Sequence, residues 1–232
     1  MDVTGIVMII GAGLFTALAY LPMANRAPSR LRSLLKTVPL LAFALASWFA
    51  FAPPLLTAGL FLSALGDFAL SRNGRAAFLY GLSAFALAHL TYILLFLGLS
   101  GLALWDAFTL APMLAIAMIA IAISTELWLA PYTGGLRWPV RIYVLLITGM
   151  GLAVLTLPVV TKSISASGEM LIAETPAMAV QIGAGLFILS DMILALRLFR
   201  LSDTHRFHGL AGWAVWVSYI AGQTLILFSA LI

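Results

Sequence analysis

The chain has 232 residues, of which 63% are apolar and only 9% are charged. A soluble domain carries roughly 25% charged residues, so this composition excludes a water-soluble globular fold. The twelve Lys and Arg residues exceed the eight acidic ones by four, but they occur in short segments between apolar runs, which indicates orientation in a membrane rather than nucleic-acid binding. Because the sequence contains no cysteine, disulfides, thiolate nucleophiles and Cys-based metal sites are excluded.

Eight apolar runs follow one another along the chain, each near the ~20 residues that a helix needs to cross a bilayer. They predict helices over residues 3–21, 34–51, 55–70, 76–97, 105–123, 136–158, 175–199 and 210–231. The first run is preceded by a single charged residue, Asp2, and lacks the cationic leader of a signal peptide, so we interpret it as a retained helix. The sequence therefore predicts one all-α domain over residues 1–232, a polytopic transmembrane helical bundle.

The distribution of basic residues tests the span count, since Lys and Arg concentrate in cytoplasmic loops. With eight spans and the amino terminus outside, Lys162 alone falls on the outer side. The other eleven basic residues fall on the cytoplasmic side: Arg26, Arg30, Arg32, Lys36, Arg72, Arg75, Arg137, Arg141, Arg197, Arg200 and Arg206. Seven or nine spans would mix the two groups, so the sequence predicts eight spans with both termini on the non-cytoplasmic side. The Ala, Leu and Arg bias points to a bacterial inner membrane.

Two acidic residues lie at least three residues inside a predicted span. Asp67 is about one turn before the cytoplasmic end of the third span and Asp191 two turns before that of the seventh, and both begin an Asp-x-x-Leu sequence. An ionised side chain at the bilayer centre costs roughly 2.5–3.5 kcal/mol on insertion scales, so such residues need a partner or a function. One alternative is that each aspartate only pairs with Lys36 or caps a neighbouring helix.

Other polar side chains could line a cavity with these aspartates. Lys36 opens the second span at the same side, and the remaining groups are His89 and Tyr92 in the fourth span, Tyr143 in the sixth, and Tyr219 and Gln223 in the eighth. The alternative for His89 is a structural hydrogen bond between helices. For the tyrosines and the glutamine, interhelical hydrogen bonding is favoured over catalysis, because such side chains commonly join membrane helices.

Two carboxyls at similar depth suit acid–base chemistry. Two such groups close together in a low-dielectric interior hold one proton between them near neutral pH, which supplies a general acid and a general base. Hydrolysis of a lipid, hydrolysis of a peptide and proton-coupled transport all remain open on this reasoning. Arg137 and Arg141 could hold a lipid phosphate or only anchor their helix, and His205 with His208 lacks a third ligand for zinc.

The order of several short motifs resembles the YhhN family, the integral-membrane lysoplasmalogenases, over nearly the whole chain. The motifs are Lys36 with Pro39, Ser63-x-x-Gly66-Asp67, Gly81-x-x-x-Phe85-x-x-x-His89-x-x-Tyr92, Tyr143, Phe187-x-x-Ser190-Asp191 and Tyr219-x-x-x-Gln223. One departure is Lys36-Thr37-Val38-Pro39, where the family pattern is Lys-Pro-Leu-Pro.

The resemblance implies hydrolysis of the vinyl ether bond of lysoplasmalogens to a fatty aldehyde and glycerophosphoethanolamine or glycerophosphocholine, without a metal or other cofactor. It implies that Asp67 and Asp191 divide the acid and base roles. The implied supporting or substrate-binding residues are Lys36, Ser63, His89, Tyr92, Tyr143, Ser190, Tyr219 and Gln223. The implied partners are a lysophospholipid substrate and the surrounding membrane lipids.

Three other functions are weighed against this one. An intramembrane aspartyl protease also carries two helical aspartates, but Ala64-Leu65-Gly66-Asp67 lacks the Gly-x-Gly-Asp pattern and no Tyr precedes Asp191. A proton-coupled transporter would use the same carboxyls as relay groups, although matched broken helices are not evident. A purely structural membrane protein would tolerate loss of both aspartates.

Overall fold

The structure, a computed structural model, describes residues 1–158, 160–164, 170–174, 177–202 and 204–231. Its long helices are α1 (Val3–Tyr20), α2 (Arg30–Phe49), α3 (Pro54–Leu70), α4 (Arg75–Ser100), α6 (Pro112–Leu129), α7 (Arg137–Val154), α8 (Ala177–Phe199) and α9 (His208–Ser229). Seven of them, all but α3, are long and apolar enough to cross a membrane. The chain is therefore an all-helical bundle with the character of an integral multi-pass membrane protein.

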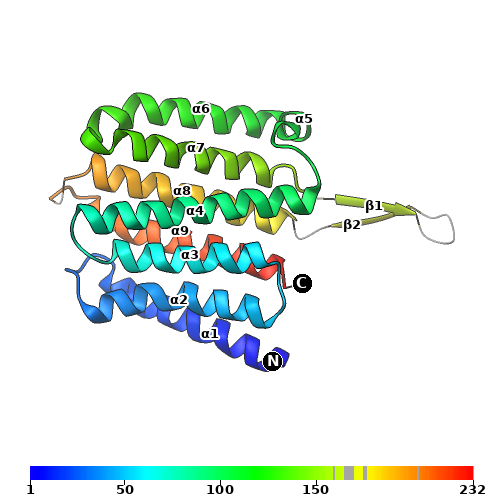
Figure 1. Ribbon diagram of the computed structural model, residues 1–232, viewed down its shortest axis with the longest axis horizontal. Helices are drawn as coiled ribbons and strands as arrows, with labels where there is room; N and C mark the ends of the chain where they lie inside the picture. Colours follow the sequence, from blue (N-terminus) through cyan, green and yellow to red (C-terminus); the bar gives the residue numbers. More distant parts are fainter. Residues whose placement is uncertain (159, 165–169, 175–176, 203, 232) are drawn as a thin grey trace.

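The remaining elements are short. A helix α5 (Ala107–Leu110) and four 3-10 turns lie in the connections: Leu21–Met23, Leu104–Asp106, Ala130–Tyr132 and Gly134–Leu136. Between α7 and α8, strands β1 (Val160–Ile164) and β2 (Met170–Glu174) pair antiparallel, with Val160 opposite Glu174 and Ile164 opposite Met170. This hairpin projects beyond one end of the bundle (Figure 1).

Local sequence explains where several helices begin and end. The Asp2 carboxylate accepts a hydrogen bond from the Gly5 backbone N–H at 3.1 Å, and the Ser29 hydroxyl accepts one from the Arg32 N–H at 3.1 Å. Such caps satisfy backbone donors that have no partner within the helix. α4 ends at Ser100, and the residue that follows it, Gly101, has a φ of 67°, which is readily reached only by glycine.

The predicted fifth helix, residues 105–123, was placed wrongly. The continuous helix there is α6, which begins at Pro112 and ends at Leu129. Proline is favoured in the first turn of a helix, where its missing N–H costs nothing. Pro112 therefore sets the start of α6, which the uniform hydropathy of the segment does not mark. α7 also ends at Val154, four residues before the predicted boundary. The predicted start of the seventh helix, Thr175, lies outside the described residues.

The helices pack side by side in the order α1, α2, α3, α4, α7, α6, with α8 and α9 behind them (Figure 1). The closest packing joins α8 to α9, where a Cβ on Gly222 would lie 2.6 Å from the carbonyl oxygen of Gly183. Small residues allow membrane helices to approach to backbone contact. By contrast, α6 lies at the edge of the bundle and packs mainly on α7.

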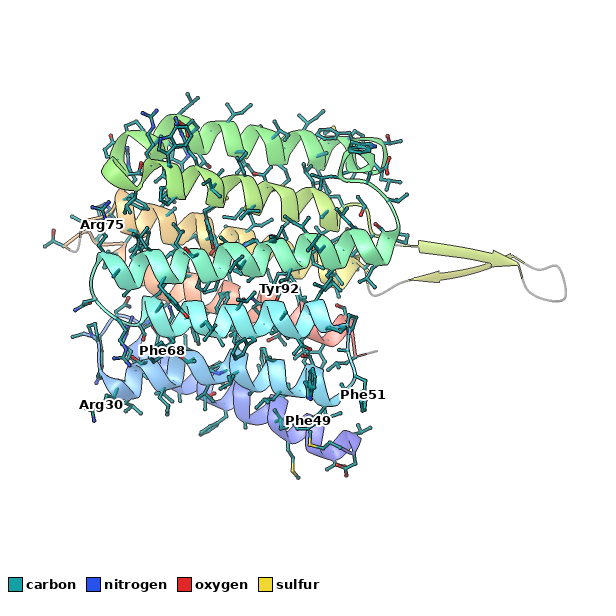
Figure 2. All side chains as sticks on the ribbon, in the orientation of Figure 1. Arg30, Phe49, Phe51, Phe68, Arg75 and Tyr92 are labelled. Atoms are coloured by element: carbon teal, nitrogen blue, oxygen red, sulfur yellow. The ribbon has the colours of Figure 1, made fainter. Side chains whose placement is uncertain are left out.

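The α1–α2, α3–α4, α6–α7 and α8–α9 connections lie together at the end of the bundle opposite the hairpin. This end, which we call the arginine end, carries the helix termini with Arg30, Arg75, Arg137 and Arg200. Figure 2 shows Arg30 and Arg75 there and Phe49 and Phe51 at the other end. Positive charge is therefore concentrated at the arginine end.

Candidate functional site

Asp67 is held by charged and polar side chains from two other helices. It lies three residues before the end of α3 and is 1% exposed. The Lys36 ammonium of α2 lies 3.3 Å from one carboxylate oxygen, and the Tyr219 hydroxyl of α9 donates to the other at 2.8 Å. The predicted pairing of Asp67 with Lys36 is therefore present in the structure. A cation and a hydroxyl donor together compensate the cost of burying this carboxylate.

A second chain of hydrogen bonds runs beside this cluster. The Tyr92 hydroxyl donates to the Gln223 side-chain carbonyl at 2.7 Å, and the Gln223 amide donates to the Ser63 hydroxyl at 3.2 Å. Ser63 precedes Asp67 by four residues and Gln223 follows Tyr219 by four, so each lies one turn along the same face. These groups join α3, α4 and α9, as expected of interhelical hydrogen-bonding residues.

Asp191 is the centre of a separate cluster on α8, where it is 7% exposed. The Tyr143 hydroxyl of α7 donates to its Oδ2 at 3.0 Å, and His89 Nε2 of α4 lies 3.2 Å from the same oxygen. His89 is fully buried. Ser190 is buried next to Asp191 in the chain.

The position of the His89 proton follows from its other ring nitrogen. Nδ1 lies 2.7 Å from the carbonyl oxygen of Phe85. Since a carbonyl only accepts hydrogen bonds, Nδ1 carries a hydrogen. Nε2 has no hydrogen bond of ordinary geometry. If the imidazole is neutral, Nε2 is an acceptor, and a proton on Asp191 can form a hydrogen bond between the carboxyl and Nε2. If both ring nitrogens carry a proton, an imidazolium faces a carboxylate.

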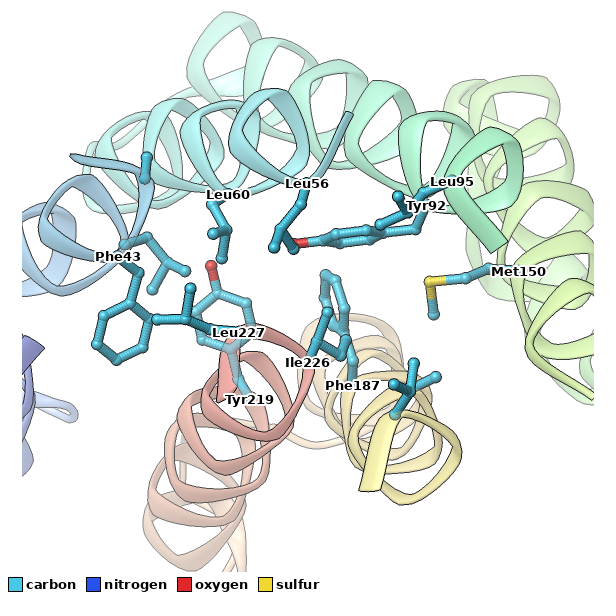
Figure 3. Close-up of a cluster of buried hydrophobic side chains, with 14 of the residues drawn as sticks. Phe43, Leu56, Leu60, Tyr92, Leu95, Met150, Phe187, Tyr219, Ile226 and Leu227 are labelled. Atoms are coloured by element: carbon cyan, nitrogen blue, oxygen red, sulfur yellow. The ribbon is translucent and has the colours of Figure 1, made fainter. Parts of the chain in front are cut away.

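Aromatic rings occupy the space between the two clusters. The Phe187 ring packs on His89, with centroids 4.6 Å apart, and on Tyr219 at 5.4 Å. Phe85 packs edge to face on Tyr219 at 5.8 Å, and a Cβ on Gly66 would lie 2.5 Å from its ring. Figure 3 shows Tyr92, Phe187 and Tyr219 converging among apolar side chains. The structure thus gathers the predicted site residues into two groups rather than around one shared cavity.

A cavity opens beside the Asp191 cluster. Its walls are formed mainly by α4, α6, α7 and α8, and most of its lining is apolar. Asp191 and Tyr143 contribute polar groups to this lining, with Thr125 and Thr148, whereas Asp67 does not line it. Along α8 the cavity extends from Phe199, the last residue of the helix, past Asp191 to Ile188, which precedes Asp191 by three residues. An apolar chain could therefore lie against the Asp191 carboxyl.

Residues at the surface of α6 and α7 were interpreted incompletely from the sequence. Arg141 forms a bidentate ion pair with Glu126 of α6, and the Arg137 guanidinium lies 3.5 Å from the same carboxylate. Glu126 was not predicted to take part, although an acid in an otherwise apolar span signals a partner. The two arginines thus anchor α7 to α6.

The two histidines of the α8–α9 connection have other partners. His205 Nδ1 accepts from the Phe207 N–H at 3.2 Å, and His208 Nε2 lies 3.4 Å from Arg197 Nε. No group of three side chains suited to a metal ion occurs among the described residues.

The profile of the YhhN family matches residues 31–230. The chain belongs to the YhhN family. The matched region extends from the first turn of α2 to the end of α9, so it contains every residue of the two clusters and of the cavity wall. Neither a curated protein nor a solved structure matches the chain.

Proposed function

We propose that this YhhN-family protein is a lysoplasmalogenase that hydrolyses the vinyl ether bond of single-chain plasmalogens. The observation that carries the proposal is the apolar cavity between α4, α6, α7 and α8, which has the Asp191 carboxyl on its wall beside His89 and Tyr143. The apolar lining matches the chemical character of a substrate with one long chain, whose reactive bond needs a proton donor in an otherwise apolar space.

The reaction requires an acid, a base and water. Protonation of the vinyl β-carbon by Asp191 forms an oxocarbenium ion, and the carboxylate left behind stabilises this cation. Water then adds to the cation and gives its proton to the same carboxylate, which restores the acid. The resulting hemiacetal loses the glycerol oxygen as an alcohol and leaves a fatty aldehyde. Asp191 thus serves as acid first and as base afterwards.

His89 and Tyr143 hold the Asp191 carboxyl in place for these steps. The Nδ1 hydrogen bond to Phe85 fixes the His89 ring so that Nε2 faces Asp191, and the Tyr143 hydroxyl bonds the same carboxyl oxygen. A carboxyl held by two partners is preorganised for proton transfer. Asp67, which does not line the cavity, has a structural role and holds Lys36 and Tyr219.

The test measures aldehyde release from a defined lysoplasmalogen by the purified protein in detergent, with Asp191→Asn as the inactive control. In D₂O, protonation of the vinyl ether places one deuterium on carbon 2 of the aldehyde, measured in product trapped at once to prevent exchange. A saturated 1-O-alkyl lysophospholipid is expected to remain intact. Absence of aldehyde, or full activity of Asp191→Asn, would contradict the proposal.

An aspartyl protease is not favoured by this arrangement. Peptide hydrolysis by paired carboxyls requires both groups around one water. Here the Phe187 ring packs between the two clusters, on His89 beside Asp191 and on Tyr219 beside Asp67. Release of peptide fragments from a transmembrane substrate would revive that alternative, as proton-dependent solute uptake into liposomes would revive the transporter.

The proposed topology has eight spans, with both termini outside the cytoplasm of a bacterial cell. α3, the shorter apolar helix of 17 residues, packs between α2 and α4 within the bundle (Figure 1). Its inclusion makes eight spans. Cytoplasmic placement of the arginine end follows from the preference of Lys and Arg for cytoplasmic loops.

The absence of cysteine allows this topology to be tested with single introduced thiols. Leu102→Cys lies at the hairpin end and Asn73→Cys at the arginine end, and both positions are exposed. On intact cells an impermeant maleimide is expected to label Leu102→Cys, whereas Asn73→Cys reacts only after permeabilisation. The reverse pattern would invert the proposed orientation.

A further inference from the structure

Arg75 lies on the face of α4 that forms the cavity wall. Arg75, Phe78, Leu82 and Phe85 are spaced three, four and three residues apart, which places them along one side of the helix. The last three line the cavity. Arg75 begins the helix at the arginine end of this row, where Figure 2 labels it. The apolar wall of the cavity is therefore continued by a guanidinium.

The Arg75 side chain reaches across to the next wall. Its Nη2 lies 3.2 Å from the position that a Cβ on Gly135 would occupy, in the turn that precedes α7. Among the described residues, no carboxylate lies within ion-pairing distance of Arg75, whereas Arg137 and Arg141 are paired with Glu126. Arg75 thus connects two walls of the cavity and keeps its charge available.

Arg200 links the other two walls in a similar way. It follows α8, and its guanidinium stacks over the Tyr132 ring at 4.0 Å, in the turn after α6. It also donates to the carbonyl of Trp128, a cavity-lining residue, at 3.5 Å. Phe78 and Phe199 pack edge to face at 6.2 Å, which joins the start of α4 to the end of α8. Two arginines therefore flank the cavity where it approaches the arginine end.

We infer that Arg75, assisted by Arg200, binds the phosphate of a single-chain glycerophospholipid whose chain occupies the cavity. The inference rests on the proposed function for the identity of the reacting bond, but the binding site can be tested without the reaction. Guanidinium groups are suited to phosphate because they present several N–H donors in one plane.

The depth of Asp191 agrees with this orientation of the lipid. Asp191 precedes Phe199 by eight residues, which is about 12 Å along α8. A headgroup held at the arginine end places the glycerol backbone between the phosphate and Asp191, so the vinyl ether next to the glycerol reaches the carboxyl. The remainder of the chain continues along the apolar lining past Ile188.

The test uses two ligands that the protein cannot hydrolyse. A 1-O-alkyl glycerophosphocholine carries the phosphate, and the matching 1-O-alkylglycerol lacks it. Equilibrium binding of both tritiated ligands is measured on the full chain in nanodiscs. Arg75→Gln is expected to weaken binding of the phospholipid about tenfold or more, because a charge-assisted hydrogen bond is lost, and to leave binding of the alkylglycerol unchanged.

Arg72→Gln is the matched control. Arg72 lies in the connection between α3 and α4, just before Arg75, and is exposed. Its guanidinium stacks over the Phe68 ring at 4.6 Å, and neither Arg72 nor Phe68 lines the cavity. Its replacement removes the same charge from the same end but is expected to leave both affinities unchanged. Arg75→Lys should restore part of the phospholipid affinity.

Equal effects of Arg72→Gln and Arg75→Gln, or equal weakening of both ligands by Arg75→Gln, would overturn the inference. So would a wild-type protein that does not prefer the phospholipid over the alkylglycerol. Selective phospholipid binding through Arg75 without aldehyde release from a lysoplasmalogen would instead contradict the proposed function and leave the phosphate site standing. The two failures are therefore distinguishable.

Discussion

The two buried aspartates occupy different surroundings, although both precede a leucine by three residues in the sequence. Asp67 has a cation and a tyrosine as partners and is enclosed. Asp191 has an imidazole and a tyrosine and lies on a cavity wall. A carboxylate beside an ammonium is stabilised as an ion, whereas a carboxyl beside an imidazole can exchange its proton. The partner therefore decides what each acid can do.

The largest effect is expected from Asp191→Asn. Asparagine keeps the shape of the side chain but cannot donate a carboxyl proton, so the rate of aldehyde release should fall by about 10² to 10⁴-fold, the contribution of general acid catalysis. Circular dichroism and size-exclusion chromatography in detergent control for folding. A well-folded Asp191→Asn protein with wild-type kcat would remove the distinction between the two acids.

Asp67→Asn should act on stability first. It leaves the Lys36 ammonium without its carboxylate, at a cost of about 3–5 kcal/mol in the free energy of unfolding. Thermal unfolding in detergent measures this loss.

The companion variant combines Asp67→Asn with Lys36→Met, which removes both charges. It should regain much of the lost stability and retain aldehyde release, because Asp67 does not line the cavity. If this folded double variant is as inactive as Asp191→Asn, then Asp67 takes part in the chemistry and the two acids are less different than proposed.

The two tyrosines sharpen the same contrast, since each donates its hydroxyl to one aspartate. Tyr143→Phe removes a partner of Asp191 and should lower kcat about tenfold, the effect of losing one hydrogen bond to a charged group. Tyr219→Phe removes a partner of Asp67 and should mainly lower the unfolding temperature. Steady-state kinetics and thermal unfolding of both variants test these two expectations. A larger loss of kcat in Tyr219→Phe than in Tyr143→Phe would contradict the assignment of the chemistry to Asp191.

The smallest effect is expected from Arg141→Gln. Its guanidinium is engaged by Glu126 at the surface of α6 and α7, and exposed ion pairs contribute little. The KM for a lysoplasmalogen should change by less than about twofold. An increase in KM that matches the effect of Arg75→Gln would move the phosphate site to α7, the alternative that the sequence left open.

Most of the fold could be predicted because hydropathy and helix length are local properties. The third helix agrees with its predicted range within a residue, since Pro53 and Pro54 mark its start. The prediction of the fifth helix failed because residues 107–130 are almost uniformly apolar, so hydropathy could not locate the ends; Pro112 is the residue that marks its true start. The hairpin had no strong sequence pattern, because its strands are only five residues each.

The candidate site was predicted by residue type but not by arrangement. Polar groups in apolar spans are conspicuous, so Asp67, Asp191 and His89 could be found from the sequence. Which of them meet depends on helix rotation and on apolar side chains such as Phe187, which do not stand out among other phenylalanines. The separation into two clusters and the assignment of the cavity to one of them are therefore properties of the packed bundle.

The glycine contact between α8 and α9 has a consequence for both acids. Asp191 lies on α8, while Tyr219, the hydroxyl partner of Asp67, lies on α9 three residues before Gly222. Because the Gly222 backbone lies against that of Gly183, the distance between the two helices is fixed at this contact. A methyl group added at either glycine would push the two helices apart and disturb the Asp67 cluster and the Asp191 cluster together.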